Sequence, residues 1–211
     1  MRRVWLSSLS LACVLGVASA AGATVLYDNL GAGSSGVDPA SSFGPLADSF
    51  STGGGSFNLK AVTVLIDGTS TDGGAFTVSL LADNSTSPGA VIVSTGSISD
   101  SVLDPTLTAE TFDLSATLSP GTRYWIEISS VAGDVPSSLD WSWSLDTSGT
   151  GVAGEFFSNT NGVVANSGGP YQMFISDTVP EAPVWALLMA GFGALGAVLR
   201  RRSRLRTAYG T

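Results

Sequence analysis

Between its two ends the chain is a series of short alternating runs separated by turn residues, and this pattern restricts the fold more than any other feature. A strand points successive side chains to opposite faces, so apolar residues at every second position give it one core face and one solvent face. Phe76, Val78 and Leu80 alternate in this way, and the run 57–66 ends at the turn signal Asp67-Gly68. Outside the ends, no stretch of ten or more residues has a helical period. The pattern predicts β structure with many turns.

Further strands are expected where the alternation recurs. The clearest are 91–93 after the turn at 83–89, 124–128 after the tight turn at 119–122, the run with Trp141 and Trp143, and 171–175; weaker ones are 25–27, 49–50, 111–114 and 155–157. Eight to ten strands without βαβ alternation predict an all-β fold, an antiparallel two-sheet sandwich that is jelly-roll-like. The Gly/Ser-rich stretches 29–44 and 149–169 are predicted to be long surface loops, which often form binding surfaces.

The C-terminal end has a different character. Val184 to Leu199 carries no charge and is followed by the arginine-rich stretch 200–206. Sixteen helical residues span roughly 24 Å, whereas a bilayer core of about 30 Å is usually crossed by about 20 residues. A short transmembrane helix is feasible if Pro183 and the arginine stems lie in the interface. The alternative, a buried core helix, is disfavoured by the arginines that follow the segment. Arg200, Arg201 and Arg202 are predicted to remain cytoplasmic and to form a stop-transfer signal.

The N-terminal end predicts a signal helix. Arg2-Arg3 precedes an apolar segment at 4–17, and small residues then offer cleavage after Ala20 or after Ala23. The single cysteine, Cys13, raises a lipoprotein alternative, but the residues before it form a poor lipobox. Once this segment is removed, the chain has no cysteine for disulfides, thiolate nucleophiles or metal sites. Both ends therefore predict export, with the intervening domain outside the cytoplasm.

The C-terminal segment resembles a PEP-CTERM sorting signal. The resemblance consists of a motif, a glycine-rich apolar core at 191–196 and the arginine cluster in that order, and the motif residues are Val179, Pro180, Glu181 and Pro183, followed by Trp185. It implies a Gram-negative bacterium whose exosortase, a sorting protease, recognises the motif, cleaves near it and passes the protein from the inner membrane towards the surface. Producers of such proteins typically also make exopolysaccharide. The chain departs from the usual Pro-Glu-Pro because Ala182 is inserted.

These segments divide the chain into four parts. Residues 1–23 form the predicted signal peptide, 24–177 the exported domain, 178–206 the sorting signal and 207–211 the cytoplasmic end. About 150 residues are enough for one domain with a substantial core.

The predicted domain also resembles the exported family called choice-of-anchor R, whose members share one domain but end in different anchors. The matching stretches run in order through nearly the whole domain: 27–29, 49–52, 76–89 (FTVSLLADNSTSPG), 120–126 (PGTRYWI), 141–143, 152–156 and 170–173. The family has no settled activity, so the resemblance implies architecture and surface display.

The predicted domain is strongly acidic. Its positive charges are Lys60 and Arg123, against sixteen of the seventeen acidic residues, which gives a net charge of −14. Nucleic acid is excluded as a partner because phosphate binding needs Lys and Arg. Divalent cations and neutral glycans are compatible with this charge, and acidity also simply keeps a protein soluble.

The residue types exclude most catalytic chemistry. The chain has no histidine, which removes Ser-His-Asp triads, Cys-His dyads and histidine metal sites. The Gly53-Gly54-Gly55 run lacks the Lys and Ser/Thr of a phosphate-binding loop. Paired carboxylates could still hydrolyse glycosides, and the best candidates are Asp140, Asp146 and Glu155. So acidic a chain produces such groups by chance, however.

Trp141 and Trp143 alternate, so on a strand both point to one face. Facing outward, they would form a flat platform for sugar rings. Facing inward, they would be core residues that bury about 150–250 Å² each, and this is the favoured alternative.

Calcium is a further alternative. The loop residues Asp67, Asp72, Asp83 and Asn84 could ligate Ca²⁺ through oxygen, but the EF-hand spacing is absent. Asp and Asn also begin turns by hydrogen bonding to nearby backbone. The chain therefore predicts no resident cofactor.

These observations together predict a non-enzymatic, surface or extracellular-matrix protein, associated with exopolysaccharide or biofilm. The alternative is a carbohydrate-binding module for the cell's own polysaccharide. A carboxylate-based glycosidase is the less favoured third reading.

Overall fold

The computed structural model describes residues 24–68, 73–131 and 138–177. The predicted signal peptide with Ala20 and Ala23, the sorting motif, the apolar segment 184–199 and the arginine cluster lie outside these residues, as does Asp72. Within the described part of the chain, no helix is long and apolar enough to cross a membrane.

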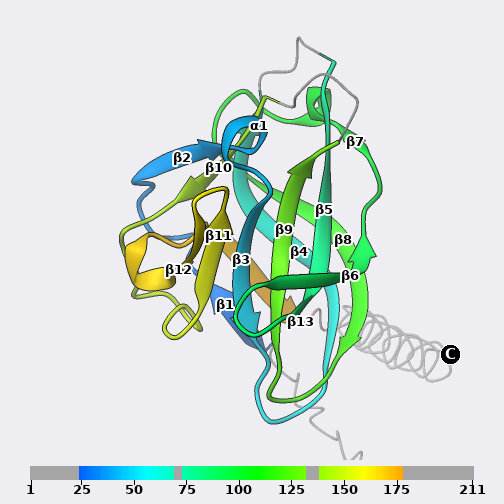
Figure 1. Cartoon of the computed structure of the whole chain (residues 1–211), viewed down its shortest axis with the longest axis vertical. Coiled ribbons are helices and arrows are strands. Elements are labelled where there is room, and N and C mark those ends of the chain that lie inside the picture. The colour runs from blue at the N-terminus through cyan, green and yellow to red at the C-terminus, as the bar shows by residue number, and fades with distance from the viewer. Residues whose placement is uncertain (1–23, 69–72, 132–137, 178–211) are drawn as a thin grey trace, which may run out of the picture. The chain divides into compact units, whose positions relative to one another are not determined.

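The domain consists of two antiparallel sheets packed face to face (Figure 1). Sheet A has six strands: Val25–Asp28 (β1), Gly36–Pro39 (β2), Phe57–Gly68 (β4), Thr108–Leu118 (β8), Leu139–Trp143 (β10) and Met173–Asp177 (β13). Sheet B has seven: Leu46–Ser51 (β3), Ala75–Asp83 (β5), Pro88–Ser94 (β6), Ile98–Ser99 (β7), Arg123–Ser130 (β9), Phe156–Asn159 (β11) and Gly162–Ala165 (β12). Three short helical turns connect them: Ala40–Phe43 (α1), Asp100–Val102 (η1) and Asn166–Gly168 (η2). The predicted all-β, two-sheet antiparallel fold is confirmed.

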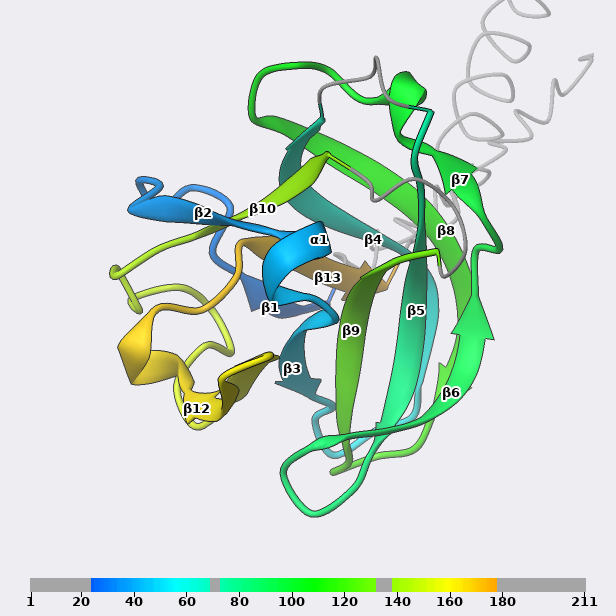
Figure 2. The same ribbon diagram turned by 45° about the horizontal axis from the view of Figure 1, so that its top comes forward.

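Each sheet has a continuous order of neighbours. In sheet A the order is β1-β13-β4-β10-β2, with β8 paired to β4, and in sheet B it is β12-β11-β3-β9-β5-β6, with β7 paired to β5. The two ends of the sheet B path, β12 and β6, lie at opposite sides of the domain in Figure 2. Most neighbours are far apart in sequence, so the sheets form through long-range pairing.

The core lies between the sheets because the alternating apolar residues of both face inward. In β4, residues Leu59, Val62, Val64 and Ile66 are fully buried, although a bulge between 59 and 61 interrupts the strict alternation. Burying one such side chain contributes about 1.5–3 kcal/mol. A smaller cluster of Ala47, Leu81, Trp125 and the partly buried Phe156 lies apart from this core, and the Trp125 indole donates a hydrogen bond to Asp83 Oδ1 at 2.8 Å.

All of the expected strands are present, several of them longer than expected, but two loop predictions were wrong. The stretch 29–44 contains β2 and α1, and 149–169 contains β11, β12 and η2. The glycines and serines of these stretches hide the alternation. The strands form because β2 pairs with β10 and β11 pairs with β3, and this tertiary pairing supplies the order that local propensity does not. The described residues therefore hold thirteen strands rather than eight to ten.

Candidate functional site

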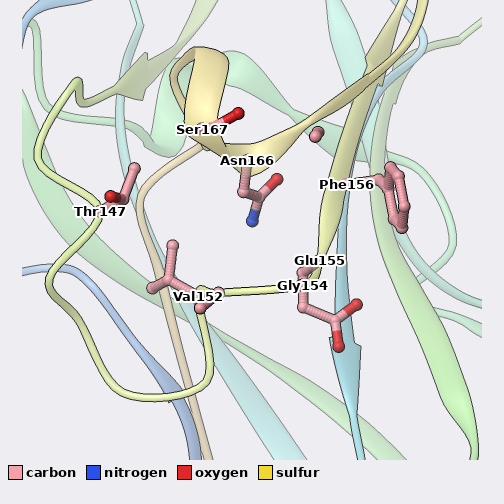
Figure 3. A pocket seen from close by; sticks show the side chains of 9 residues that line it. Thr147, Val152, Gly154, Glu155, Phe156, Asn166 and Ser167 are labelled. Atoms are coloured by element: carbon pink, nitrogen blue, oxygen red, sulfur yellow. The ribbon is translucent and has the colours of Figure 1, made fainter.

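A cavity of about 270 Å³ lies where the loop after β10 meets η2. Thr147 and residues 152–156 line it from the loop and the start of β11, and residues 165–167 line it from the end of β12 and from η2. Figure 3 shows the Asn166 side chain in the middle of these residues, with the Glu155 carboxyl group pointing away from it. The volume is just below the range of about 300–1,000 Å³ for ligand sites, so the cavity admits at most a small chemical group.

The carboxyl group of Glu155 is held by an ion pair and two hydroxyl groups. Arg123 Nε donates to Glu155 Oε2 at 2.8 Å, and the Ser49 hydroxyl donates to the same oxygen at 2.5 Å. The Ser51 hydroxyl donates to Oε1. The Arg123 guanidinium also lies over the Phe156 ring, 4.9 Å from its centroid.

This arrangement suits a structural carboxylate better than a catalytic one. Glu155 is 5% exposed, and both of its oxygens accept hydrogen bonds from fixed donors. A general acid needs a proton to give and a substrate within reach. The carboxyl group of Glu155 is instead bound to the Arg123 guanidinium, and it points away from Asn166 in the middle of the lining (Figure 3).

A second carboxyl group, that of Asp48, is fully buried next to the lining residue Asn166. It accepts hydrogen bonds from the Tyr171 backbone N–H at 2.7 Å, from the Asn166 side-chain amide at 3.1 Å and from the Tyr27 hydroxyl at 3.5 Å. The Asn166 amide also donates to the Tyr27 hydroxyl at 3.0 Å. Because Asp48 belongs to sheet B and Tyr27 to sheet A, this network joins the two sheets.

Burial determines the protonation of this network. Loss of solvent raises the pKa of Asp48 well above the ordinary value, although the hydrogen bonds from Asn166 and Tyr171 oppose the shift. Burial likewise raises the pKa of Tyr27 and, together with its 2.6 Å hydrogen bond to Asp38, the pKa of Tyr171. Both tyrosines therefore stay neutral donors throughout the physiological pH range.

Asn166 connects the network to the cavity. It is 2% exposed, and while its nitrogen is bound to Tyr27 and Asp48, its Oδ1 has no hydrogen-bond partner among the described residues. An unsatisfied buried acceptor costs about 1–3 kcal/mol. The Oδ1 atom of Asn166 is thus a buried acceptor of the cavity lining that a further hydrogen-bond donor would satisfy.

Trp141 faces the core. Its side chain is fully buried, its ring stacks on Tyr171 with centroids 4.7 Å apart, and its indole donates to the Gln172 backbone oxygen at 3.0 Å. A platform that includes Trp141 cannot receive a sugar in this structure, so the inward-facing alternative holds for this residue.

Trp143 points to the same side but is only partly buried, packing against the core cluster. Glycines make room for its ring: a Cβ on Gly36 would lie 2.6 Å from the indole, and one on Gly169 would lie 3.1 Å from it. These close backbone approaches hold Trp143 in place. Because Trp141 is fully buried, the two rings form no flat exposed pair for a ligand.

The three candidate glycosidase carboxylates have different surroundings. Asp140 lies opposite Asp67 across β10 and β4, and burial, then the charge of Asp38, raises its pKa. Asp146 lines a separate hollow of about 290 Å³, which Asp28 also lines, and hydrogen bonds from Ser148 lower its pKa. Glu155 is bound to Arg123, so the three do not form one site.

Of the loop residues considered for calcium, Asp83 has ordinary structural partners. Asp83 accepts hydrogen bonds from the Trp125 indole and from the Thr86 backbone N–H. Burial, then the charge of Asp140, raises the pKa of Asp67. Among the described residues, no group of three or more acidic side chains is arranged to hold a metal ion.

The buried network of Asp48, Asn166, Tyr27 and Tyr171 is absent from the sequence predictions. Asp48 lies in the run Leu46–Ser51, two positions from both Leu46 and Phe50. An Asp that shares a strand face with two apolar residues is the signal that could have indicated an inward carboxylate. The partners could not be inferred, because the hydrogen bonds to Asp48 come from residues 21, 118 and 123 positions away.

A comparison with known protein families found no family model that matches the chain, and a comparison with curated proteins found no match.

Proposed function

We propose that this chain is an exported, non-enzymatic protein of the cell surface or extracellular matrix, sorted by an exosortase and associated with exopolysaccharide or biofilm. The observation that carries the proposal is the order of three features at the C-terminus: the motif around Pro180 and Glu181, the uncharged segment 184–199 and the arginine cluster. A charge-free segment stopped by arginines holds a protein in a membrane with the arginines on the cytoplasmic side. The motif before it would then be available to a protease on the far side.

The domain chemistry supports a non-enzymatic role. Glu155 is bound to Arg123, and Asp48 is buried among donors. With no histidine and no cysteine beyond Cys13, neither of these residue types supplies a base or a nucleophile to the predicted domain. The buried carboxyl groups of Glu155 and Asp48 thus stabilise the fold.

We also propose that the sandwich is of the jelly-roll type. In support, β3, β4 and β5 alternate between the sheets, and so do β8, β9 and β10. Sheet B has the order β3-β9-β5-β6. It packs against sheet A, in which β4 lies between β8 on one side and both β13 and β10 on the other. Two Greek keys rolled together produce such an alternation. In this view β11 and β12 extend one sheet edge.

Processing of the tail tests the sorting proposal. The full chain would be produced in a Gram-negative host that carries an exosortase, and its intact mass measured on material from the cell surface and medium. We expect a mass that lacks the arginine cluster. In a variant with Pro180→Ala and Glu181→Ala, the protein should keep the cluster and stay in the inner membrane, because the protease no longer recognises it.

Surface material whose mass includes residues 200–211 would overturn the sorting proposal. Equal processing of the motif variant would show that cleavage does not depend on the motif.

A further inference from the structure

The two end strands of sheet B are uncharged and expose branched apolar side chains. On β6, Val91 is 58% and Ile92 is 48% exposed, and on β12, Val163 is 38% and Val164 is 43% exposed. Neither Pro88–Ser94 nor Gly162–Ala165 contains a charged residue. Natural edge strands are commonly protected by charges, especially lysine, against pairing with other chains. Here that protection is missing at both ends of one sheet.

The strand directions make these two ends complementary. Every neighbour along the path β12-β11-β3-β9-β5-β6 is antiparallel. With six strands on the path, β12 and β6 run in opposite directions. A strand β6 placed beside β12 of another copy therefore continues the antiparallel order, which is the favourable arrangement for edge pairing.

The charge distribution favours a contact at these edges. Residues 24–177 carry a net charge of −14, so two copies repel each other over most of their surface. The uncharged strands β6 and β12 are places where two acidic copies can approach without opposing carboxylates. Valine and isoleucine side chains facing each other across strands stabilise such a pair.

We propose that the domain associates head to tail with further copies of itself, with β6 of one copy pairing with β12 of the next. The two surfaces differ, so the contact is heterologous and does not close on a single partner. Because sheet twist turns each copy relative to the last, the assembly extends as a helical chain. The short length of β12 and the irregular register between β5 and β6 keep each contact modest. The association does not depend on how the tail is processed.

Three matched valine substitutions test this arrangement in the full chain. Val91→Lys places a charge on β6, Val164→Lys places one on β12, and Val102→Lys is the control, since Val102 is 66% exposed and belongs to η1. All three change the net charge equally. The predicted tail is common to all variants, so any association through it would be the same in each.

Sedimentation velocity in a nonionic detergent would measure the mass distribution over a range of protein concentrations. We expect the unmodified chain and Val102→Lys to associate progressively with concentration. Val91→Lys and Val164→Lys should each weaken association by roughly tenfold or more, because a lysine at the contact would be desolvated or opposed.

The decisive measurement is a mixture of the two edge variants. Val91→Lys retains an intact β12 and Val164→Lys retains an intact β6, so an equal mixture should form one-to-one dimers and nothing larger. An unmodified chain that stays monomeric at every concentration would overturn the proposal. A mixture that stays monomeric would also overturn it, as would a Val102→Lys variant that dissociates as readily as the edge variants.

Discussion

Replacing Trp141 by alanine is expected to lower the free energy of unfolding by about 3–5 kcal/mol, as large aromatic-to-alanine changes in a core do. The indole is fully buried, stacks on Tyr171 and donates a hydrogen bond to the Gln172 backbone oxygen. Its removal leaves a cavity and one carbonyl without its donor. Domains of this size are typically stable by about 5–15 kcal/mol, so the variant should be marginal.

Urea unfolding of the full chain in a nonionic detergent, followed by circular dichroism in the β-sheet region, would measure the loss. Leu145→Ala is the control: its side chain is 64% exposed, and its removal should change stability by no more than about 0.5 kcal/mol. A Trp141→Ala variant as stable as the control would mean that the ring lies outside the core. In that case the sugar platform would again become the better interpretation of the two tryptophans.

Replacing Asp48 by alanine is the second change with a large expected effect. It removes the acceptor of the Tyr171 backbone N–H, the Asn166 amide and the Tyr27 hydroxyl. Each buried donor left without an acceptor costs about 1–3 kcal/mol, so a loss of several kcal/mol is expected. The Asp48→Asn variant should lose less, because its amide oxygen still accepts two of these hydrogen bonds while its amide nitrogen faces the Tyr171 N–H.

The same residue gives a dependence on pH whose sign follows from its burial. Desolvation raises the pKa of Asp48 in the folded domain, so the folded state binds the proton more tightly than the unfolded state does. The stabilisation is fully present below the ordinary Asp pKa of about 3.9 and is lost as the pH rises through the raised pKa of the folded domain. The unmodified chain should therefore lose stability relative to Asp48→Asn as the pH rises above the ordinary Asp pKa of about 3.9.

Urea midpoints of the two proteins, measured side by side from acidic to alkaline pH, would show this difference. Asp67, Glu127 and Asp140 also have raised pKa values through burial, but they are common to both proteins and cancel in the comparison. Parallel stability curves would contradict a proton-binding role for Asp48.

Local patterning was a good guide to the strands with a clear alternation. The strands β4, β5, β9 and β10 lie where the sequence predicted them, because one face of each is apolar and a turn signal adjoins most of them. It failed for β2 and β12. Gly36–Pro39 and Gly162–Ala165 have little alternation, and pairing with β10 and β11 makes them strands.

The candidate site was the harder prediction. Glu155 was selected as a carboxylate near two tryptophans, yet its partner is Arg123, and its hydroxyl donors lie 104 and 106 positions away. Asp140, Asp146 and Glu155 are close in sequence but have separate surroundings. Residues that are close in sequence are also close in space within one helix or hairpin. In a sandwich whose consecutive strands pass from one sheet to the other, they need not be.

By itself, the sequence determined the strand-forming character of residues 24–177, the acidity of that part and the lack of histidine, because periodicity, charge and residue type are local properties. The tertiary structure decided that the Trp141 side chain faces the core and that Asp48 is buried among hydrogen-bond donors. It also decided that two uncharged strands form the two ends of the same sheet. Each of these depends on contacts between residues far apart in the chain, and those contacts exist only once the two sheets have packed together.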